Sequence, residues 1–310
     1  MESICKSHVS LHFLPAELLA IIVQLGQVEG FLKPLSQVNK AFRQLCAPIL
    51  FSTLRITSSI TGLNCLTQAS RSPISPYVRT IYYEASELLD PRKGIIRSAQ
   101  DAKVLCASFP CFPHLDTILL RFADNIKQPF QWLADRVLLD GRLSFPDHIE
   151  KVATAIVAAK EHGISIHTFA IFGFYPRSLS ESPLRSGLLN DALADIQELR
   201  VEESPAVLEF FTQNPLPHLR RFELGSYWIS ATELEEFIYA HANTLRFLHL
   251  EDIWLLNEKH EESSIYLSLA STEAILESIS HIRRSGILRE LTMNRDINGH
   301  CEIRELLGKE

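Results

Sequence analysis

The chain has 310 residues and a mass of 35.1 kDa, which suggests two domains at about 150 residues each unless the sequence repeats. Its 30 basic and 37 acidic side chains give a net charge of −7, which argues against a broad surface for nucleic acid or anionic membrane. With 46% hydrophobic residues the chain can bury a large core. The 15 prolines are scattered along it and predict short elements.

Signals for export, glycosylation and membrane insertion are missing from the sequence. The first residues, MESICKSHVSLHF, lack a basic segment followed by an apolar run, and no Asn-x-Ser/Thr site occurs. The six cysteines have no regular spacing, as is typical of a protein whose thiols stay reduced. We therefore expect a soluble intracellular protein, cytoplasmic or nuclear, with no membrane partner.

Motifs for phosphate binding, acyl transfer and metal ligation are missing as well. The chain contains no Gly-x-Gly-x-x-Gly or Walker-type loop, no Gly-x-Ser-x-Gly turn and no Cys-x-x-Cys pair. His8 and His12 have helical spacing but lie in a Ser-rich leader, which is more typical of a solvated tail. We expect no catalytic residues, no metal and no cofactor. An enzyme assembled from residues distant in sequence remains an alternative.

A helical module is predicted from residue 14 onward. Pro15 fits the first turn of a helix, and one apolar face then follows at Leu18, Leu19, Ile22 and Leu25. A second helical run, which we expect Pro48 to close, contains Leu32, Leu35, Val38, Phe42 and Leu45. Helices in about 40 residues cannot bury all of this apolar surface alone, so the surplus must face the rest of the chain or a partner.

Several segments of this module match a known pattern at fixed offsets: Leu14-Pro15-x-Glu17-Leu18-Leu19, Ile22, Phe31-Leu32, Leu35, Val38-Asn39-Lys40-x-Phe42-Arg43 and Pro48-x-Leu50-Phe51. Over residues 12–56 the chain resembles an F-box of the form common in fungal F-box proteins. The resemblance implies binding to a Skp-type adaptor and, through it, to a cullin. The residues that would contact the adaptor or brace that face are Leu14, Pro15, Leu18, Leu19, Ile22, Val38 and Phe42. A helical cap on the following domain is the alternative.

Downstream, the apolar pattern L-x-x-L-x-L recurs seven times, at Val78/Ile81/Tyr83, Leu115/Ile118/Leu120, Ile166/Phe169/Ile171, Ile196/Leu199/Val201, Leu219/Phe222/Leu224, Leu245/Leu248/Leu250 and Leu288/Leu291/Met293. Each predicts a short strand with one buried face. Helices are expected between them, at 95–109, 149–162, 184–194, 206–213, 232–242 and 272–285. Strand and helix in alternation predict a leucine-rich-repeat-like solenoid, although the Asn or Cys that usually follows the strand is mostly missing. An ordinary mixed α/β domain is the alternative.

The strand residues between the buried ones should line the face opposite the helices. One row contains Tyr82, Leu119, Ala170, Arg200, Glu223, His249 and Thr292, and beyond it lie Arg221, Phe247, Glu290 and Glu251. A row with both signs of charge and some aromatic side chains suits recognition of a protein or peptide. The candidate substrate-binding residues are Tyr82, Arg200, Arg221, Glu223, Phe247 and His249.

The expected fold class is therefore α/β, with a flexible leader at 1–11, a short all-α F-box-like module at 12–56 and a degenerate leucine-rich-repeat-like solenoid at 57–310. The expected function is that of a non-catalytic substrate-recognition subunit of a Skp adaptor–cullin–F-box ubiquitin ligase, recruiting a target protein through the solenoid. The alternative is a scaffold whose F-box-like module acts outside ubiquitin transfer. The sequence does not identify the target.

Overall fold

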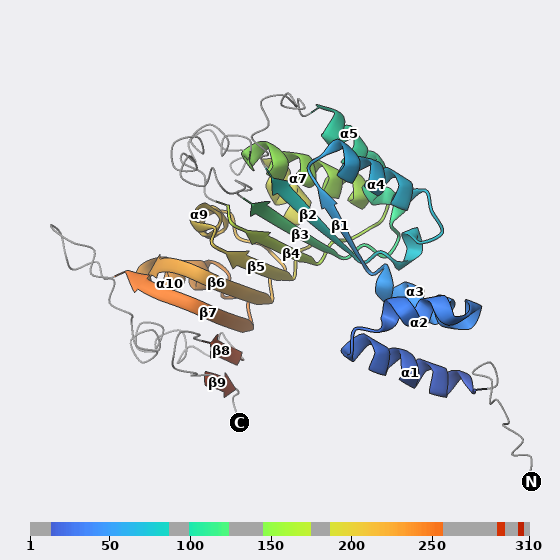
Figure 1. Ribbon diagram of the computed structural model, residues 1–310. Helices are drawn as coiled ribbons and strands as arrows, with labels where there is room; N and C mark the ends of the chain where they lie inside the picture. The colour runs from blue at the N-terminus through green and yellow to red at the C-terminus, as the bar shows by residue number, and fades with distance from the viewer. Residues whose placement is uncertain are drawn as a thin grey trace, which may run out of the picture.

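The computed structural model describes residues 14–86, 99–123, 145–174, 187–256, 290–294 and 303–306. Three N-terminal helices precede a large, mainly parallel sheet, which carries helices on one of its faces (Figure 1). The predicted α/β class is confirmed at this level. The leader at 1–11 and the helix expected at 272–285 lie outside the described residues.

The sheet follows the order of the chain from strand to strand. Its strands are β1 (Thr53–Thr57), β2 (Thr80–Ser86), β3 (Thr117–Ala123), β4 (Thr168–Phe172), β5 (Glu198–Glu202), β6 (Arg221–Ser230), β7 (Phe247–Leu256), β8 (Glu290–Asn294) and β9 (Ile303–Leu306). All pairings are parallel except the last, between β8 and β9. Each of the seven strands predicted from the apolar pattern is present and begins two residues after the first position of its pattern.

Two strands extend the sheet beyond those seven. All of β1 except its last residue, Thr57, falls within the bounds expected for the helical module, yet it pairs with β2 along its whole length. The sheet therefore begins at Thr53, inside the 12–56 segment. β9 was not predicted from the sequence, because its residues lack the apolar pattern that marks the parallel strands.

The same hydrogen-bond arrangement recurs at the start of consecutive strands. The carbonyl of Ser52 accepts hydrogen bonds from two successive N–H groups, those of Arg79 and Thr80. Equivalent pairs of bonds, all between 2.8 and 3.1 Å, run from the carbonyls of Arg79, Asp116, His167, Gln197 and Arg220 to the following strand. These bonds fix the register, and in a sheet the register decides which side chains share a face.

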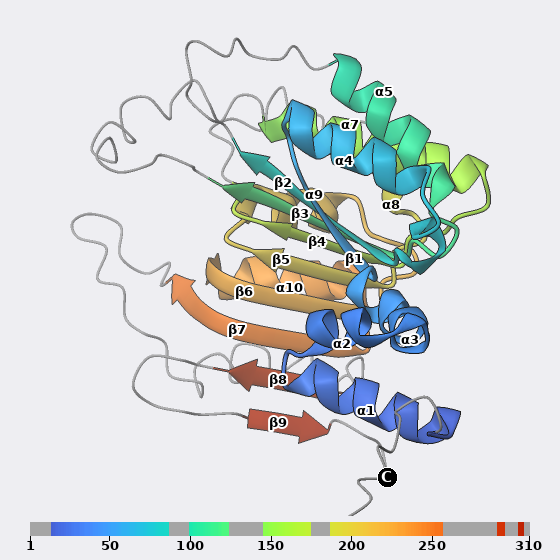
Figure 2. The same ribbon diagram turned by 45° about the vertical axis from the view of Figure 1, so that its right-hand side comes forward.

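Helices cover one face of the sheet and pack side by side (Figures 1 and 2). They are α4 (Ile60–Ser70), α5 (Ala99–Ser108), α7 (Phe145–Glu161), α8 (Gly187–Leu193), α9 (Pro205–Gln213) and α10 (Ala231–Ala240), with 3₁₀ turns η2 (Ser75–Tyr77) and η3 (Phe109–Cys111) before β2 and β3. Five of these α-helices match predicted ones, but α4 was missed. Ser59 caps its N-terminus, because the Ser59 hydroxyl accepts a hydrogen bond from the N–H of Gly62.

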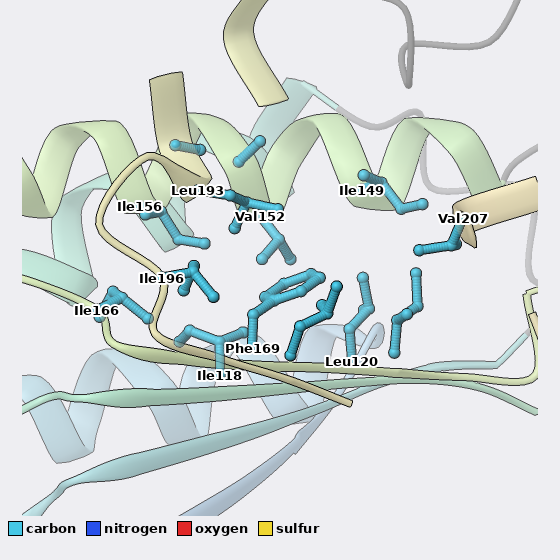
Figure 3. Close-up of a cluster of buried hydrophobic side chains, with 14 of the residues drawn as sticks. Ile118, Leu120, Ile149, Val152, Ile156, Ile166, Phe169, Leu193, Ile196 and Val207 are labelled. Atoms are coloured by element: carbon cyan, nitrogen blue, oxygen red, sulfur yellow. The ribbon is translucent and has the colours of Figure 1, made fainter. Parts of the chain in front are cut away.

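The core lies between this helical layer and the sheet. Figure 3 shows side chains of α7, such as Ile149 and Val152, directed at Ile118, Leu120 and Phe169 of β3 and β4, and all of these are buried. Burying one such side chain stabilises the fold by about 1.5–3 kcal/mol. The apolar pattern of the strands therefore determines where the helices pack.

A buried serine joins the segments that follow two neighbouring strands. Ser204, fully buried, lies two residues after β5. Its hydroxyl accepts a hydrogen bond from the N–H of Phe174 at 2.9 Å and donates one to the carbonyl of Glu202 at 2.8 Å. The hydroxyl thus links the chain after β4 to the chain after β5, and it satisfies a buried N–H group.

The N-terminal helices α1 (Ala16–Val28), α2 (Leu32–Val38) and α3 (Lys40–Leu50) have a small core of their own, formed by Val23, Leu32, Phe42 and Cys46. Asn39 caps α3 by accepting a hydrogen bond from the N–H of Phe42. Pro48 does not end this helix as expected but lies inside it. In the last turn a proline removes a single hydrogen bond, and the helix continues for two more residues.

Two glycines with positive φ differ in the space around them. Gly173 has φ +69°, and a Cβ there would lie 2.6 Å from the carbonyl oxygen of Phe122, whereas Gly163 has φ +81° and nothing within 4 Å. We predict that Gly163→Ala lowers the free energy of unfolding by about 1–2 kcal/mol, the cost of a left-handed alanine. Gly173→Ala should lower the free energy of unfolding by about 1–3 kcal/mol more, because its Cβ would clash with the carbonyl oxygen of Phe122. Urea denaturation measures both, and equal losses would contradict the close approach at Gly173.

Candidate functional site

The face of the sheet opposite the described helices carries the predicted row of side chains. In the register of the strands, Tyr82, Leu119, Ala170, Arg200, Glu223, His249 and Thr292 are successive neighbours, and Arg55 of β1 precedes them. Arg221, Phe247 and Glu290 are likewise neighbours in the row before it. The sequence pattern therefore predicted which residues share this face of the sheet, called here the open face, although Ala170 is buried on it.

Arg200 of β5 is the centre of an ionic cluster on the open face. Its guanidinium lies 3.2 Å from Glu202, 3.8 Å from Glu223 of β6 and 3.7 Å from Glu251 of β7, and it sits over the ring of Phe172 at 5.5 Å. These partners come from four successive strands, β4 to β7. Because the side chains are partly exposed, each ion pair contributes at most about 1 kcal/mol to stability.

The neighbouring candidates join the same cluster. Arg221 Nε donates a hydrogen bond to Glu223 at 2.8 Å, and His249 Nε2 lies 3.9 Å from Glu251. Phe247, which follows Arg221 in the register, is 37% exposed. Five of the six predicted substrate-binding residues are thus brought together on β5 to β7.

Tyr82 lies apart from that cluster, because β3 and β4 separate β2 from β5. Its ring packs under the Arg55 guanidinium at 4.7 Å, and its hydroxyl lies 3.5 Å from Arg121. The structure therefore divides the predicted site into a small aromatic and cationic group on β1 to β3 and a larger ionic cluster on β5 to β7.

The residues predicted to bind or brace an adaptor divide into two groups. Phe42 is fully buried, and Leu19 and Ile22 are partly buried against the small core of α1 to α3. Leu18 and Val38 are exposed, Pro15 is exposed and Leu14 is half-buried. The single apolar face expected on α1 is therefore two faces, one turned to the core and one turned outward.

The outward face of α1 carries more apolar residues than were predicted from the sequence. Besides Leu18 it presents Ile21, Leu25 and Val28, at spacings of three, four and three residues, and the last two are 60% and 83% exposed. Phe31, just after the helix, is exposed as well. We call Leu18, Ile21, Leu25 and Val28 the outer α1 face. An apolar helix face of this kind is typical of a surface that binds a partner.

A buried polar group that was not predicted from the sequence lies where β2, α5 and α7 meet. Tyr83 Oη is 2.8 Å from His148 Nδ1, and Lys151 Nζ is 3.7 Å from Asp101 Oδ2. Asp101 is 5% exposed and its Oδ1 has no hydrogen-bond partner. In the sequence Tyr83 was interpreted as a core strand residue and the others as parts of two separate helices, so only the fold brings them together.

Burial shifts the pKa values of these groups. It lowers the pKa of His148 to about 4, with a smaller contribution from the Lys151 ammonium. It raises the pKa of Tyr83 and of Asp101, and for Asp101 the nearby Lys151 opposes the rise. A second buried histidine, His241, accepts a hydrogen bond from the N–H of Leu216, and burial lowers its pKa too. Both histidines are neutral parts of the core at neutral pH.

The described residues offer no group of three or more His, Cys, Asp or Glu side chains placed to hold a metal ion. None of the described helices is long and apolar enough to cross a membrane. No protein-family model matches the chain, and no curated protein matches it. Among the described residues, the open face and the outer α1 face are the two candidate binding surfaces.

The buried histidines predict that the protein loses stability in mild acid. The folded-state pKa of His148 is depressed, so the unfolded chain binds a proton more readily than the folded chain. The contribution of His148 to the free energy of unfolding is therefore complete above about pH 6.5 and is lost as the pH falls toward 4. From pH 7 to pH 5 we expect His148 to account for a loss of about 2 kcal/mol.

Urea denaturation across this pH range measures that loss. His148→Gln keeps a polar partner for Tyr83 and should flatten the dependence, whereas the exposed control His218→Gln should leave it unchanged. A wild-type slope retained in His148→Gln would contradict the assignment.

Proposed function

We propose that the chain is a substrate receptor of a Skp adaptor–cullin–F-box ubiquitin ligase, with α1 to α3 as an F-box and the following sheet and helices as a degenerate leucine-rich-repeat solenoid. The outer α1 face carries this proposal. Four apolar side chains in one helical stripe are exposed, although the other face of the same helix already packs on a core. A helix apolar on both sides needs a partner for the second side.

The arrangement of the sheet supports the solenoid part of the proposal. Consecutive strands pair in chain order, the same pair of hydrogen bonds recurs at six junctions, and the described helices gather on one face. In a solenoid each unit contacts only its neighbours and the strands line an extended binding surface. The open face is that surface in this proposal, and it holds the target protein.

In this role the chain performs no reaction itself. The adaptor and the cullin bring the ubiquitin-transfer machinery close to a target held on the open face, inside the cell. The contribution of the chain is affinity and position, supplied by two surfaces at separate places in the fold (Figure 1).

The adaptor contact is tested with a double substitution on the outer α1 face. Leu18→Asp with Leu25→Asp should abolish capture of a purified Skp-type adaptor by the full chain. Each leucine buried in an interface contributes about 1.5–3 kcal/mol, so affinity should fall about a hundredfold or more. Both side chains are exposed in the free chain, so the thermal midpoint of the variant should stay close to that of the wild type.

A control is Tyr239→Asp, which places a negative charge at an exposed aromatic position of α10. It should leave adaptor capture unchanged. Phe42→Asp is unsuitable as a test, because Phe42 is fully buried and its replacement would unfold the helices. Failure of the wild-type chain to retain the adaptor, or equal retention by the double variant, would overturn the proposal.

A further inference from the structure

The ionic cluster on β5 to β7 carries more negative than positive charge. Its paired carboxylates are Glu202, Glu223 and Glu251, and its guanidinium groups are those of Arg200 and Arg221. A fourth carboxylate, that of the exposed Glu198, is the register neighbour of Arg221. Arg200 alone is shared among three of the carboxylates. The Arg121 guanidinium of β3 also interacts electrostatically with Glu202. Four carboxylates thus face three guanidinium groups, so the cluster does not neutralise itself and one carboxylate is left in excess.

Aromatic surface lies next to these carboxylates. Phe247 follows Arg221 in the register and is exposed, and the ring of Phe172 already holds a guanidinium, that of Arg200, at 5.5 Å. A guanidinium is attracted both to carboxylates and to the face of an aromatic ring, and its aliphatic stem packs on apolar surface. The surroundings of Arg200 thus show, within the chain itself, how a cationic side chain sits on this part of the open face.

The other end of the open face has the opposite balance. On β1 to β3 the guanidinium groups of Arg55 and Arg121 flank Tyr82, and Glu84 is the register neighbour of Arg121. The attraction for a cationic ligand is therefore confined to β5 to β7, rather than spread over the sheet.

We infer that the open face of β5 to β7 binds a basic, extended segment of a protein, rich in Arg or Lys, whose cations pair with Glu198, Glu223 and Glu251. This inference rests on the proposed function only in treating that protein as the target of a ligase. Charge complementarity selects a cationic ligand, and the row of side chains from successive strands suits a segment that lies across the strands.

The probe is a fluorescently labelled peptide of alternating Arg and Ser residues, titrated with the full chain and followed by fluorescence anisotropy. The peptide should bind, its affinity should fall as salt is added, and a matched peptide of Glu and Ser should not bind. Glu223→Gln with Glu251→Gln should weaken binding by about five- to tenfold, the size expected for two partly exposed ion pairs.

Two further variants separate this site from general attraction to an acidic protein. Glu161→Gln with Glu236→Gln removes the same charge from exposed positions on α7 and α10 and should leave the affinity unchanged. Arg200→Gln frees the shared carboxylates and should tighten binding, which mere damage to the surface would not do. Absence of binding, or equal weakening by both double variants, would overturn the inference.

The two proposals fail separately in these experiments. A chain that retains the Skp-type adaptor but ignores the basic peptide contradicts this inference and leaves the ligase proposal standing. A chain that binds the peptide at β5 to β7 but not the adaptor contradicts the ligase proposal alone.

Discussion

The backbone carbonyl just before each of the strands β1 to β6 is the constraint on which the rest of the structure depends. It accepts hydrogen bonds from two successive N–H groups at the start of the next strand, so the strands β1 to β7 begin at the same height as their neighbours. Because side chains alternate between the two faces of a strand, this common start places the apolar positions of these strands under the helices. The charged and aromatic positions then gather on the open face as continuous rows.

Much of this arrangement could be predicted from the sequence because it depends on a local alternation. Leu199 and Val201 are buried and Arg200 is not, and the same order holds at Phe222, Glu223 and Leu224 of β6, so seven strands and the rows of the open face were placed correctly. In β4 the middle residue, Ala170, is buried as well. Register alone places Arg200 beside Glu223, whereas its contacts with Glu202 and Phe172 were not among the predictions. By contrast, α4 was missed because its first turn contains Gly62 and β-branched residues, and the cap at Ser59 is a weak signal in isolation.

Other features could not be predicted because they depend on contacts between distant segments. Tyr83 and His148 meet only when α7 packs on β2, and the Ser204 hydroxyl joins two segments only because the N–H of Phe174 lies within reach. On α1 the helical period showed apolar residues but not how many of them the small core could hold. The core takes Leu19, Ile22 and Val23 and leaves Leu18, Leu25 and Val28 outside.

In this account the outer α1 face binds a Skp-type adaptor while the open face stays available for a target. Hydrogen–deuterium exchange of the full chain, alone and with purified adaptor, tests this division most directly. The account predicts slower exchange in α1 to α3 on adding adaptor and unchanged exchange in β1 to β7. Slower exchange in the strands, or no change in the helices, would contradict it.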